Sequence, residues 1–186
     1  MYCNKSLKKY LDDLAAKLAA PGGGSAAALA GCLGASLLSM VLNFTIGKAR
    51  YARYAKELKT TLKKSEELRM KFLDLVDLDI AAYRSKNIKK ALGIPLEVVR
   101  LCFDGMKLCP GLVKKGNVNL ISDVGVAAVF FEAGFCAAGF NVEINLKCLG
   151  NKELSRKLRK ELAKKEKLIK NLRLKVEGKV NEIIGR

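Results

Sequence analysis

Apolar and polar residues follow a helical period along nearly the whole chain of 186 residues. Apolar positions recur three or four residues apart, which is the spacing that puts them on one face of a helix. Nowhere do they alternate with polar residues as in a half-buried strand. No internal repeat or low-complexity linker divides the chain. We therefore expect an all-α fold in a single domain covering residues 1–186.

The pattern predicts six helices, over residues 6–20, 25–47, 49–83, 96–108, 122–146 and 152–184. Ser6 is a suitable cap for the first helix, and Pro95 fits the first turn of the fourth. Residues 85–93 read as a polar, basic connection that contains at most a short helical piece. Short connections between long helices favour an up-and-down helical bundle, with small residues at the helix contacts.

The second predicted helix carries no charged residue and is long enough to span a bilayer. Small and polar residues surround it on all sides, and they include Gly31, Gly34, Ala35, Ser36, Ser39 and Asn43. This composition suits close packing inside a bundle or across a dimer interface, although small residues also pack membrane helices. We expect the bundle, and no membrane partner.

Composition and charge narrow the functional classes. Half of the residues are hydrophobic but only 6% are aromatic, which favours close helix packing over a β-sandwich. The net charge is +17, and much of the excess lies between Lys147 and Lys179. Such a surface can be a solvated helix face, or it can bind nucleic acid, an anionic membrane or a polyanionic small molecule. Because no nucleic-acid recognition motif accompanies the charge, we expect a solvated face and no nucleic-acid partner.

The chain has six cysteines and no histidine. The absence of an imidazole excludes Ser–His and Cys–His catalysis. No Cys-x-x-Cys pair is present, so the usual zinc sites lack their ligand spacing and we expect no metal. The cysteines lie mostly among apolar residues, which is typical of reduced, buried thiols. The N-terminus lacks the apolar core of a signal peptide, so we expect a cytoplasmic protein.

Asp79 is the first candidate for chemistry. It lies at the centre of an apolar stripe formed by Leu68, Phe72, Leu75, Val76 and Tyr83. Burial raises the pKa of a carboxyl group, and a raised pKa suits a general acid near neutral pH. The alternative is a structural aspartate tied to a lysine, an arginine or a helix end.

Three further polar residues are candidates. Asp123 lies at the head of a predicted helix, where it is either the N-cap or a carboxylate presented to a ligand. Asn141 and Asn145 are four residues apart and share a helix face. Two amides on a face of small residues either bind a ligand or bond across to another helix.

Pro21-Gly22-Gly23-Gly24-Ser25 is an oligoglycine turn that leads into a helix. Free backbone N–H groups and the helix dipole can bind an anion or a carbonyl there. The turn is not a Walker loop, because no Gly-Lys-Ser/Thr follows, and no strand precedes it as in a dinucleotide fingerprint. A flexible loop capped by Ser25 explains the pattern equally well.

The same turn, followed by Thr45-Ile46-Gly47-Lys48, resembles the opening signature of the formiminotransferase-cyclodeaminase C-terminal domain family. Residues 77–83, 122–128 and 141–146 resemble three further blocks of that family, in the same order and spacing. The resemblance implies a helical homodimer that acts on folate-bound one-carbon units. It implies either a methenyltetrahydrofolate cyclohydrolase or a formimidoyltetrahydrofolate cyclodeaminase, with Asp79 aligned to the proton donor.

The resemblance also implies the other site residues. Gly22, Gly23, Gly24 and Ser25 would line the pocket through their backbone amides, while Asn43, Asp123, Asn141 and Asn145 would contact the pterin or the one-carbon group. Lys48 would meet the glutamate tail of a folate, including a polyglutamylated one. A tetrahydrofolate derivative is then the substrate, and no cofactor is bound permanently. The sequence carries no fused transferase domain, which favours the cyclohydrolase reaction.

Two departures from the family motivate an alternative. The connection over residues 84–94 is shorter than in the family and lacks a Leu-Pro-Lys type motif and a later arginine. Ala81 occupies the position where the family has a glutamate, two residues after the catalytic aspartate. The alternative is a catalytically impaired relative that keeps the fold and binds folate or a protein partner. A nucleic-acid binder is a third hypothesis that rests on charge alone.

Overall fold

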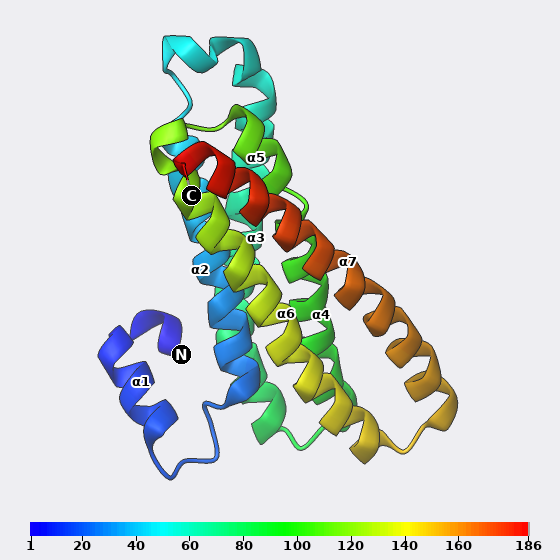
Figure 1. The fold of residues 1–186 in the computed structure, drawn as a ribbon. Coiled ribbons are helices and arrows are strands. Elements are labelled where there is room, and N and C mark those ends of the chain that lie inside the picture. Colours follow the sequence, from blue (N-terminus) through cyan, green and yellow to red (C-terminus); the bar gives the residue numbers. More distant parts are fainter. Residues whose placement is uncertain (186) are drawn as a thin grey trace.

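The computed structural model describes residues 1–185, which form an up-and-down bundle of α-helices (Figure 1). Five long helices build the bundle: α2 (Gly23–Asn43), α3 (Ala55–Arg84), α4 (Ile88–Met106), α6 (Ile121–Leu149) and α7 (Lys152–Ile184). The short elements are η1 (Tyr2–Asn4), α1 (Leu7–Ala15), η2 (Ala49–Tyr54), α5 (Cys109–Lys115) and η3 (Val118–Leu120). The predicted fold class is confirmed.

The uncharged helix α2 is the centre of the bundle and packs most extensively against α6 and α3. It runs antiparallel to α6, because Gly34 lies against Ala127 while Gly134, further along α6, lies against Ala27. Figure 1 shows α2 and α6 side by side, with α1 set apart from the bundle near the start of α2. The N-terminal end of α2 and the C-terminal end of α6 therefore share one end of the molecule.

Three glycines, on α2 and α4, make room for two buried phenylalanines. A Cβ on Gly31 would lie 2.4 Å from the ring of Phe72, and a Cβ on Gly105 would lie 2.4 Å from the ring of Phe131. A Cβ on Gly34 would lie 3.1 Å from the Phe131 ring. The centroids of the two rings are 6.4 Å apart, so the aromatic pair fills the middle of the bundle. The predicted packing through small residues is confirmed.

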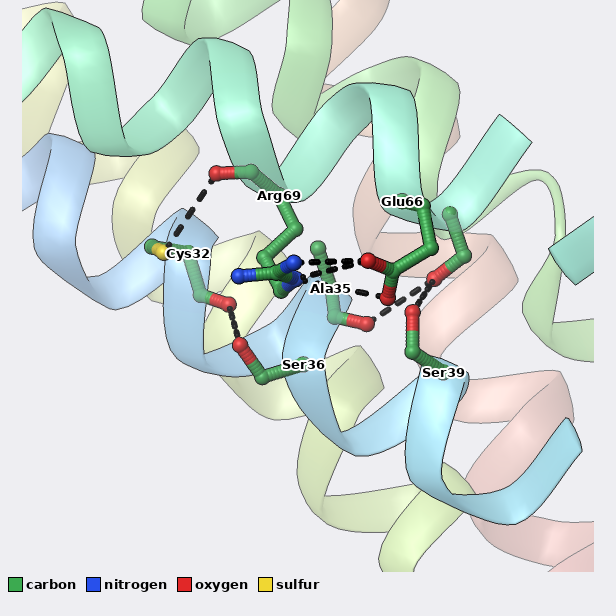
Figure 2. A network of polar contacts seen from close by, with 7 residues as sticks. Cys32, Ala35, Ser36, Ser39, Glu66 and Arg69 are labelled. Atoms are coloured by element: carbon green, nitrogen blue, oxygen red, sulfur yellow. Dashed lines mark hydrogen bonds and ion pairs between the residues drawn. The ribbon is translucent and has the colours of Figure 1, made fainter. Parts of the chain in front are cut away.

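Small polar residues of α2 are satisfied by hydrogen bonds inside the bundle, as Figure 2 shows. The Ser39 hydroxyl donates to the Ser65 hydroxyl of α3 at 3.0 Å, and Ser65 donates to the Ala35 carbonyl at 2.9 Å. The Ser36 hydroxyl donates to the carbonyl of Cys32 in its own helix. These bonds remove the cost of burying hydroxyl groups between two helices.

Two segments of the described chain, Gly23–Asn43 and Val118–Leu149, are long and apolar enough to cross a membrane. Within the bundle, 61% of the apolar window of α2 is buried against other helices. A central helix of a water-soluble bundle meets the same criteria of length and composition, so these two helices are weak evidence for a membrane protein.

The ends of the first two helices differ from the prediction. Ser6 caps α1 as expected, by accepting from the Lys9 N–H, but α1 ends at Ala15 instead of residue 20. Of its residues only Tyr10 is buried, so little tertiary packing is available to extend it. Helix α2 begins at Gly23, two residues earlier than predicted, and ends at Asn43 instead of residue 47.

The predicted start of the fourth helix, at residue 96, was wrong. Helix α4 begins at Ile88, after the Asn87 side chain caps it by accepting from two backbone N–H groups, so Pro95 lies inside the helix. A proline in a helix interior leaves the carbonyl four residues earlier without its donor. Here that carbonyl belongs to Ala91, and the Asn145 side chain donates to it at 2.7 Å. A bond from α6 thus compensates for the proline.

Three smaller expectations also changed. Residues 49–54 form the 3₁₀ segment η2, so the helix predicted over 49–83 begins at Ala55. Tyr83 is expected on the buried stripe, yet it is 59% exposed. Cys32, Cys102 and Cys109 are buried as expected, and burial raises the pKa of Cys109 to about 12. Cys148 is exposed.

Candidate functional site

The carboxyl group of Asp79 lies against the first turn of α2. A Cβ added to Gly24 would lie 2.3 Å from Oδ1 of Asp79 and 2.7 Å from its Cγ. Because no side chain can occupy that space, glycine at position 24 is what lets the carboxyl group approach the α2 backbone. The apolar stripe of α3 places Asp79 there, with Val76 and Ile80 buried on either side of it.

Asp79 replaces the missing N-cap side chain of α2. The N-cap residue is Gly22, which has no side chain to accept from the first N–H groups of the helix. The backbone N–H of Ser25 faces the Asp79 carboxylate instead and lowers its pKa. Asp79 thus lies at a helix end, as in the structural alternative that the sequence left open. The N–H groups of Gly23 and Gly24 lie in the same turn, directly before Ser25 in the sequence.

Burial raises the pKa of Asp79, and the Ser25 N–H lowers it by less. The first effect arises because an ionised carboxylate loses hydration when α2 and α3 close around it. The second arises because a hydrogen bond to the charged form stabilises that form. The net direction is upward, which brings the carboxyl group closer to the pH range where it can exchange protons during catalysis.

The Ser25 side chain links three helices. Ser25 is fully buried, and its hydroxyl donates to the Val76 carbonyl of α3 at 3.0 Å. The Tyr10 hydroxyl of α1 lies 3.1 Å from the same oxygen. Burial is the largest cause that raises the pKa of Tyr10, and the negative charge of Asp79 raises it further. Tyr10 is thus a neighbour of Asp79 that the sequence analysis did not single out.

Asn141 reaches the same turn from α6. A Cβ on Gly23 would lie 3.7 Å from the Asn141 Nδ2 atom and 3.9 Å from its Oδ1 atom. The Nδ2 group donates to the carbonyl of Ala137 within α6, so the amide is held in place. Gly23 is exposed, and a Cβ on Gly22 would meet no atom within 4 Å. The oligoglycine turn therefore borders open space between Asp79 and Asn141.

Asn145 has a structural contact at the same end of α6. Its bond to the Ala91 carbonyl of α4 matches one of the two expectations for this pair of amides, a bond across to another helix. The bond uses Nδ2, and it compensates for the N–H that Pro95 lacks. Its role towards a ligand stays a prediction.

Asn43, Lys48 and Asp123 lie at the opposite end of the bundle within one chain. Asp123 and Asn141 are both on α6, and their separation in sequence corresponds to about 27 Å along the helix axis. Asn43 ends α2 and Lys48 precedes η2, so both are a whole helix length from Gly23. Within one chain, the predicted site residues therefore lie at two ends of the bundle. The Asp79 end comprises Gly22–Ser25, Asp79, Asn141 and Asn145. The Asp123 end comprises Asn43, Lys48 and Asp123.

Asp123 is not the helix cap that its position suggested. Helix α6 starts at Ile121 after Leu120, so Asp123 lies within the first turn, where a negative charge interacts favourably with the helix dipole. Among residues 1–185 its side chain forms no hydrogen bond or ion pair that would explain it structurally. Its half-buried carboxylate is thus available to a partner at this end.

The Asp123 end contains basic residues that sequence reasoning did not single out. A cavity of about 260 Å³ is lined there by residues that include Arg50, Arg53, Lys114 and Tyr51. The Tyr51 hydroxyl accepts from the backbone N–H of Val118, which fixes one wall. Among residues 1–185, no Asp or Glu side chain lines this cavity. The repeated Ala-Arg-Tyr of η2 was the signal in the sequence that could have indicated it.

The Asp79 end has the parts needed for proton transfer to a polar ligand. A carboxyl group with a raised pKa can donate or accept a proton near neutral pH. The backbone N–H groups of Gly23 and Gly24 can bind an oxygen or a ring nitrogen beside it, and Asn141 offers an amide. A cluster of three or more His, Cys, Asp or Glu side chains that could hold a metal ion is absent from residues 1–185.

Comparison with known proteins connects this geometry to an enzyme family. The chain is 36% identical to a methenyltetrahydrofolate cyclohydrolase of Methylorubrum extorquens over 86% of its own length and 88% of that protein. It is 27% identical to the formimidoyltransferase-cyclodeaminase of Rattus norvegicus over 85% of its length, and the match spans 34% of that longer protein. The crystal structure of a formiminotetrahydrofolate cyclodeaminase from Thermotoga maritima superposes with a TM-score of 0.91 at 29% identity, over 97% of this chain and 98% of the other.

The sequence model of the formiminotransferase-cyclodeaminase family matches residues 6–86 and 84–164. The two matched parts overlap at residues 84–86, in the connection between α3 and α4. Lys86 adopts a positive φ of 53° in that connection, as the tight turn requires. Together the two parts cover residues 6–164, which include the Asp79 end, the Asp123 end and the first part of α7. The chain belongs to the formiminotransferase-cyclodeaminase family.

Proposed function

We propose that the chain is a folate-dependent one-carbon enzyme that opens the ring of methenyltetrahydrofolate by hydrolysis. The observation that carries this proposal is the carboxyl group of Asp79, which burial and Gly24 hold against the open N-terminal turn of α2. The similarity to a methenyltetrahydrofolate cyclohydrolase over most of both chains supports the choice of substrate. The reaction is hydrolysis of a C–N bond in a cyclic amidine.

In this reaction Asp79 first acts as a base. Water adds to the carbon between the two folate nitrogens, and the Asp79 carboxylate takes a proton from that water. The protonated Asp79 then returns the proton to the ring nitrogen as its bond to the carbon breaks. The second proton of the water leaves to solvent when the formyl carbonyl forms. The N–H groups of Gly23 and Gly24 would stabilise the oxygen that gains charge during the addition.

The cyclodeaminase reaction is the second candidate, and the likeness to the Thermotoga maritima structure supports it. Here folate N10 would attack the formimino carbon and lose its hydrogen to solvent as a proton, and Asp79 would protonate the formimino nitrogen, which departs as ammonia when its bond to the carbon breaks. The same raised pKa serves this step, because the group must carry a proton at working pH. The two reactions would use the same site. In the hydrolysis water attacks and a ring nitrogen leaves, whereas in the cyclisation N10 attacks and ammonia leaves.

We propose further that the enzyme is a homodimer whose interface is the apolar face of α2 and α6. This apolar face comprises Leu33, Phe44, Val126, Val129, Phe140 and Ile144, each at least 45% exposed. Charged residues are absent from α2. On α6, Glu132 pairs with Arg173 and Glu143 pairs with Arg159, both of α7. Contiguous exposed apolar surface rimmed by polar residues is typical of a protein–protein interface.

A two-fold axis that crosses α2 and α6 would complete the site. Such an axis places the start of α2 in one subunit opposite the end of α2 in the other, because the interface is self-complementary. Asp123, Asn43 and Lys48 of one subunit would then face Asp79 of the second. This arrangement accounts for the distance that separates the two groups within one chain.

The basic cavity at the Asp123 end suits the glutamate tail of the substrate. Arg50, Arg53 and Lys114 line it, and Lys48 is exposed beside it. Several cations with no carboxylate among the lining residues favour a ligand that carries carboxylates, and additional glutamates would add further ion pairs. We therefore propose that polyglutamylated folate binds with its tail at this end.

We propose that the enzyme works in the cytoplasm, needs no permanently bound cofactor, and binds neither nucleic acid nor membranes. The positive charge of α7 is then a solvated face, as expected for a helix whose lysines and arginines alternate with glutamates such as Glu161, which pairs with Lys165.

Turnover of the purified chain tests the function. Methenyltetrahydrofolate loses its characteristic absorbance on hydrolysis, and formimidoyltetrahydrofolate releases ammonia on cyclisation. We expect the first activity to exceed the second, because the more similar relative is a cyclohydrolase. Folate binding measured by calorimetry without turnover of either substrate would instead support the catalytically impaired alternative.

Mixing two inactive variants tests the shared site. In Asp79→Asn and Asp123→Asn homodimers every site is damaged. In a heterodimer one of the two sites has both damaged residues and the other has neither. Random exchange of subunits should therefore restore about one quarter of wild-type activity. No restoration, with subunit exchange verified by mass spectrometry of the mixed dimer, would contradict the shared site.

A further inference from the structure

Helix α1 is attached to the bundle through very few side chains. Leu7 and Leu11 are 65% and 48% exposed, and Tyr10 is the only buried residue of the helix. Tyr2, just before α1, packs its ring edge-on against the Tyr10 ring at 5.4 Å between centroids. Asp77 of α3 accepts hydrogen bonds from the backbone of the same segment. Tyr10 is thus the contact by which α1 reaches the interior.

The direction of the bond between Tyr10 and Ser25 follows from the number of available hydrogens. A serine hydroxyl has a single hydrogen. Ser25 donates that hydrogen to the Val76 carbonyl at 3.0 Å, so towards Tyr10 its oxygen can only accept. The Tyr10 hydroxyl, 3.1 Å away, is therefore the donor. The result is a directed chain from α1 through Ser25 to α3.

The same serine controls Asp79 through its backbone. The Ser25 N–H is the donor that stabilises the Asp79 carboxylate, and Gly24, its neighbour, is in contact with that carboxyl group. A buried side chain held by two hydrogen bonds has one position, which also fixes the N–H of the same residue. Removing either bond lets the first turn of α2 move relative to Asp79.

We propose that Tyr10 is a positioning residue of the active site, which acts through Ser25 to hold the first turn of α2 against Asp79 and makes α1 part of the site wall. The proposal rests on the proposed function for its kinetic consequences, and on the contacts alone for its structural ones. It assigns a role to α1, a helix that otherwise exposes most of its apolar residues.

The ionisable surroundings of Asp79 are simple enough for a pH test. Tyr10 is the ionisable neighbour from α1, α2 is uncharged, and α6 brings the uncharged Asn141 to the adjacent Gly23. Within residues 1–185 the causes that shift the pKa of Asp79 are burial and the Ser25 N–H. A weaker bond from that N–H must therefore raise the pKa of Asp79 further.

Tyr10→Phe keeps the buried ring and removes only the donor. We expect kcat/KM to fall by about 10-fold, the effect of losing one buried hydrogen bond that orients a site. The limb of the pH–rate profile that reports Asp79 should move to higher pH. Tyr2→Phe is the matched control: it removes the other tyrosine hydroxyl of this segment, which donates to Asp13, and leaves Ser25 untouched. Its pH profile should equal that of the wild type.

A double-mutant cycle with Ser25→Ala separates positioning from general destabilisation. Because Ser25→Ala already deletes the bond that Tyr10 makes, adding Tyr10→Phe should cost nothing more in kcat/KM. Additive losses, or equal pH profiles for Tyr10→Phe and the wild type, would overturn the proposal. Absence of turnover in the wild type would instead refute the proposed function. Titration of the Asp79 carboxyl by ¹³C NMR in wild type and Tyr10→Phe then decides about Tyr10, and an identical titration overturns its role.

Discussion

Asp79→Asn is expected to reduce turnover by about 10²- to 10⁴-fold, the range that a positioned general acid or base contributes. Asparagine has nearly the same shape but can neither take a proton from water nor return one to nitrogen. The measurement is kcat/KM for methenyltetrahydrofolate. Turnover within a few-fold of wild type would mean that another group performs the proton transfer.

The same variant should be more stable than the wild type at neutral pH. Because the folded-state pKa of Asp79 is raised, ionisation of this group destabilises the fold once the pH exceeds about 3.9, where an unfolded aspartate titrates. The neutral amide avoids that penalty. The gain in Tm should therefore be present at pH 7 and vanish as the pH falls below about 4.

Asp77→Asn is the matched control, two residues away on the same helix. Burial alone would raise the pKa of Asp77, but hydrogen bonds from the backbone N–H groups of Tyr2 and Cys3 lower it overall. Its contribution to stability is present above about pH 3.9 and is lost as the pH falls. Asp77→Asn should therefore lower Tm at pH 7 and spare the chemistry. Changes of the same sign in both variants would contradict the assigned pKa directions.

Gly31→Ala is expected to destabilise the fold by about 1–3 kcal/mol, because overpacking of a rigid core costs at least that much. The added methyl group would lie 2.4 Å from the ring of Phe72, which is fully buried and packs against Phe131. Neither ring can move without disturbing the other. The measurement is the free energy of unfolding from urea denaturation.

Gly178→Ala provides a control with the opposite expected sign. Gly178 lies in α7 with no atom within 4 Å of its added Cβ, so only helix propensity acts. That substitution should stabilise the protein by up to about 1 kcal/mol. If Gly31→Ala were also stabilising, the close contact with Phe72 would be wrong. Combining Gly31→Ala with Phe72→Leu should recover part of the lost free energy of unfolding, because the smaller leucine side chain leaves room for the added methyl group.

Hydrophobic periodicity located the helices well where burial is continuous. The last helix was predicted over residues 152–184, and α7 spans Lys152–Ile184, because Asn151 caps it and apolar residues recur along its whole length. The sequence predicts too late a start for α4, because Pro95 is typical of the first turn of a helix. The donor that makes an interior proline tolerable comes from Asn145, more than 50 residues away in sequence.

The candidate site was predicted in part. Asp79 could be singled out because one carboxylate on an apolar helical stripe is visible in sequence, and the oligoglycine turn because its composition is unusual. That Gly24 is the residue in contact with Asp79 depends on how α2 and α3 align, which periodicity does not report. Tyr10 was missed as a neighbour of Asp79 because a tyrosine on an apolar face reads as ordinary core.

By itself, the sequence determined the class of fold, the positions of most helices, the family, and Asp79 as the residue to test, because these depend on local period and local motif. Only the tertiary structure decided which groups meet. It brought Gly24, Ser25, Asn141 and Tyr10 to Asp79, and it placed Asp123 and Lys48 a helix length away. The physical reason is that helix pairing is set by the fit of side chains across an interface, such as Gly31 on Phe72, and that fit exists only after the helices have packed.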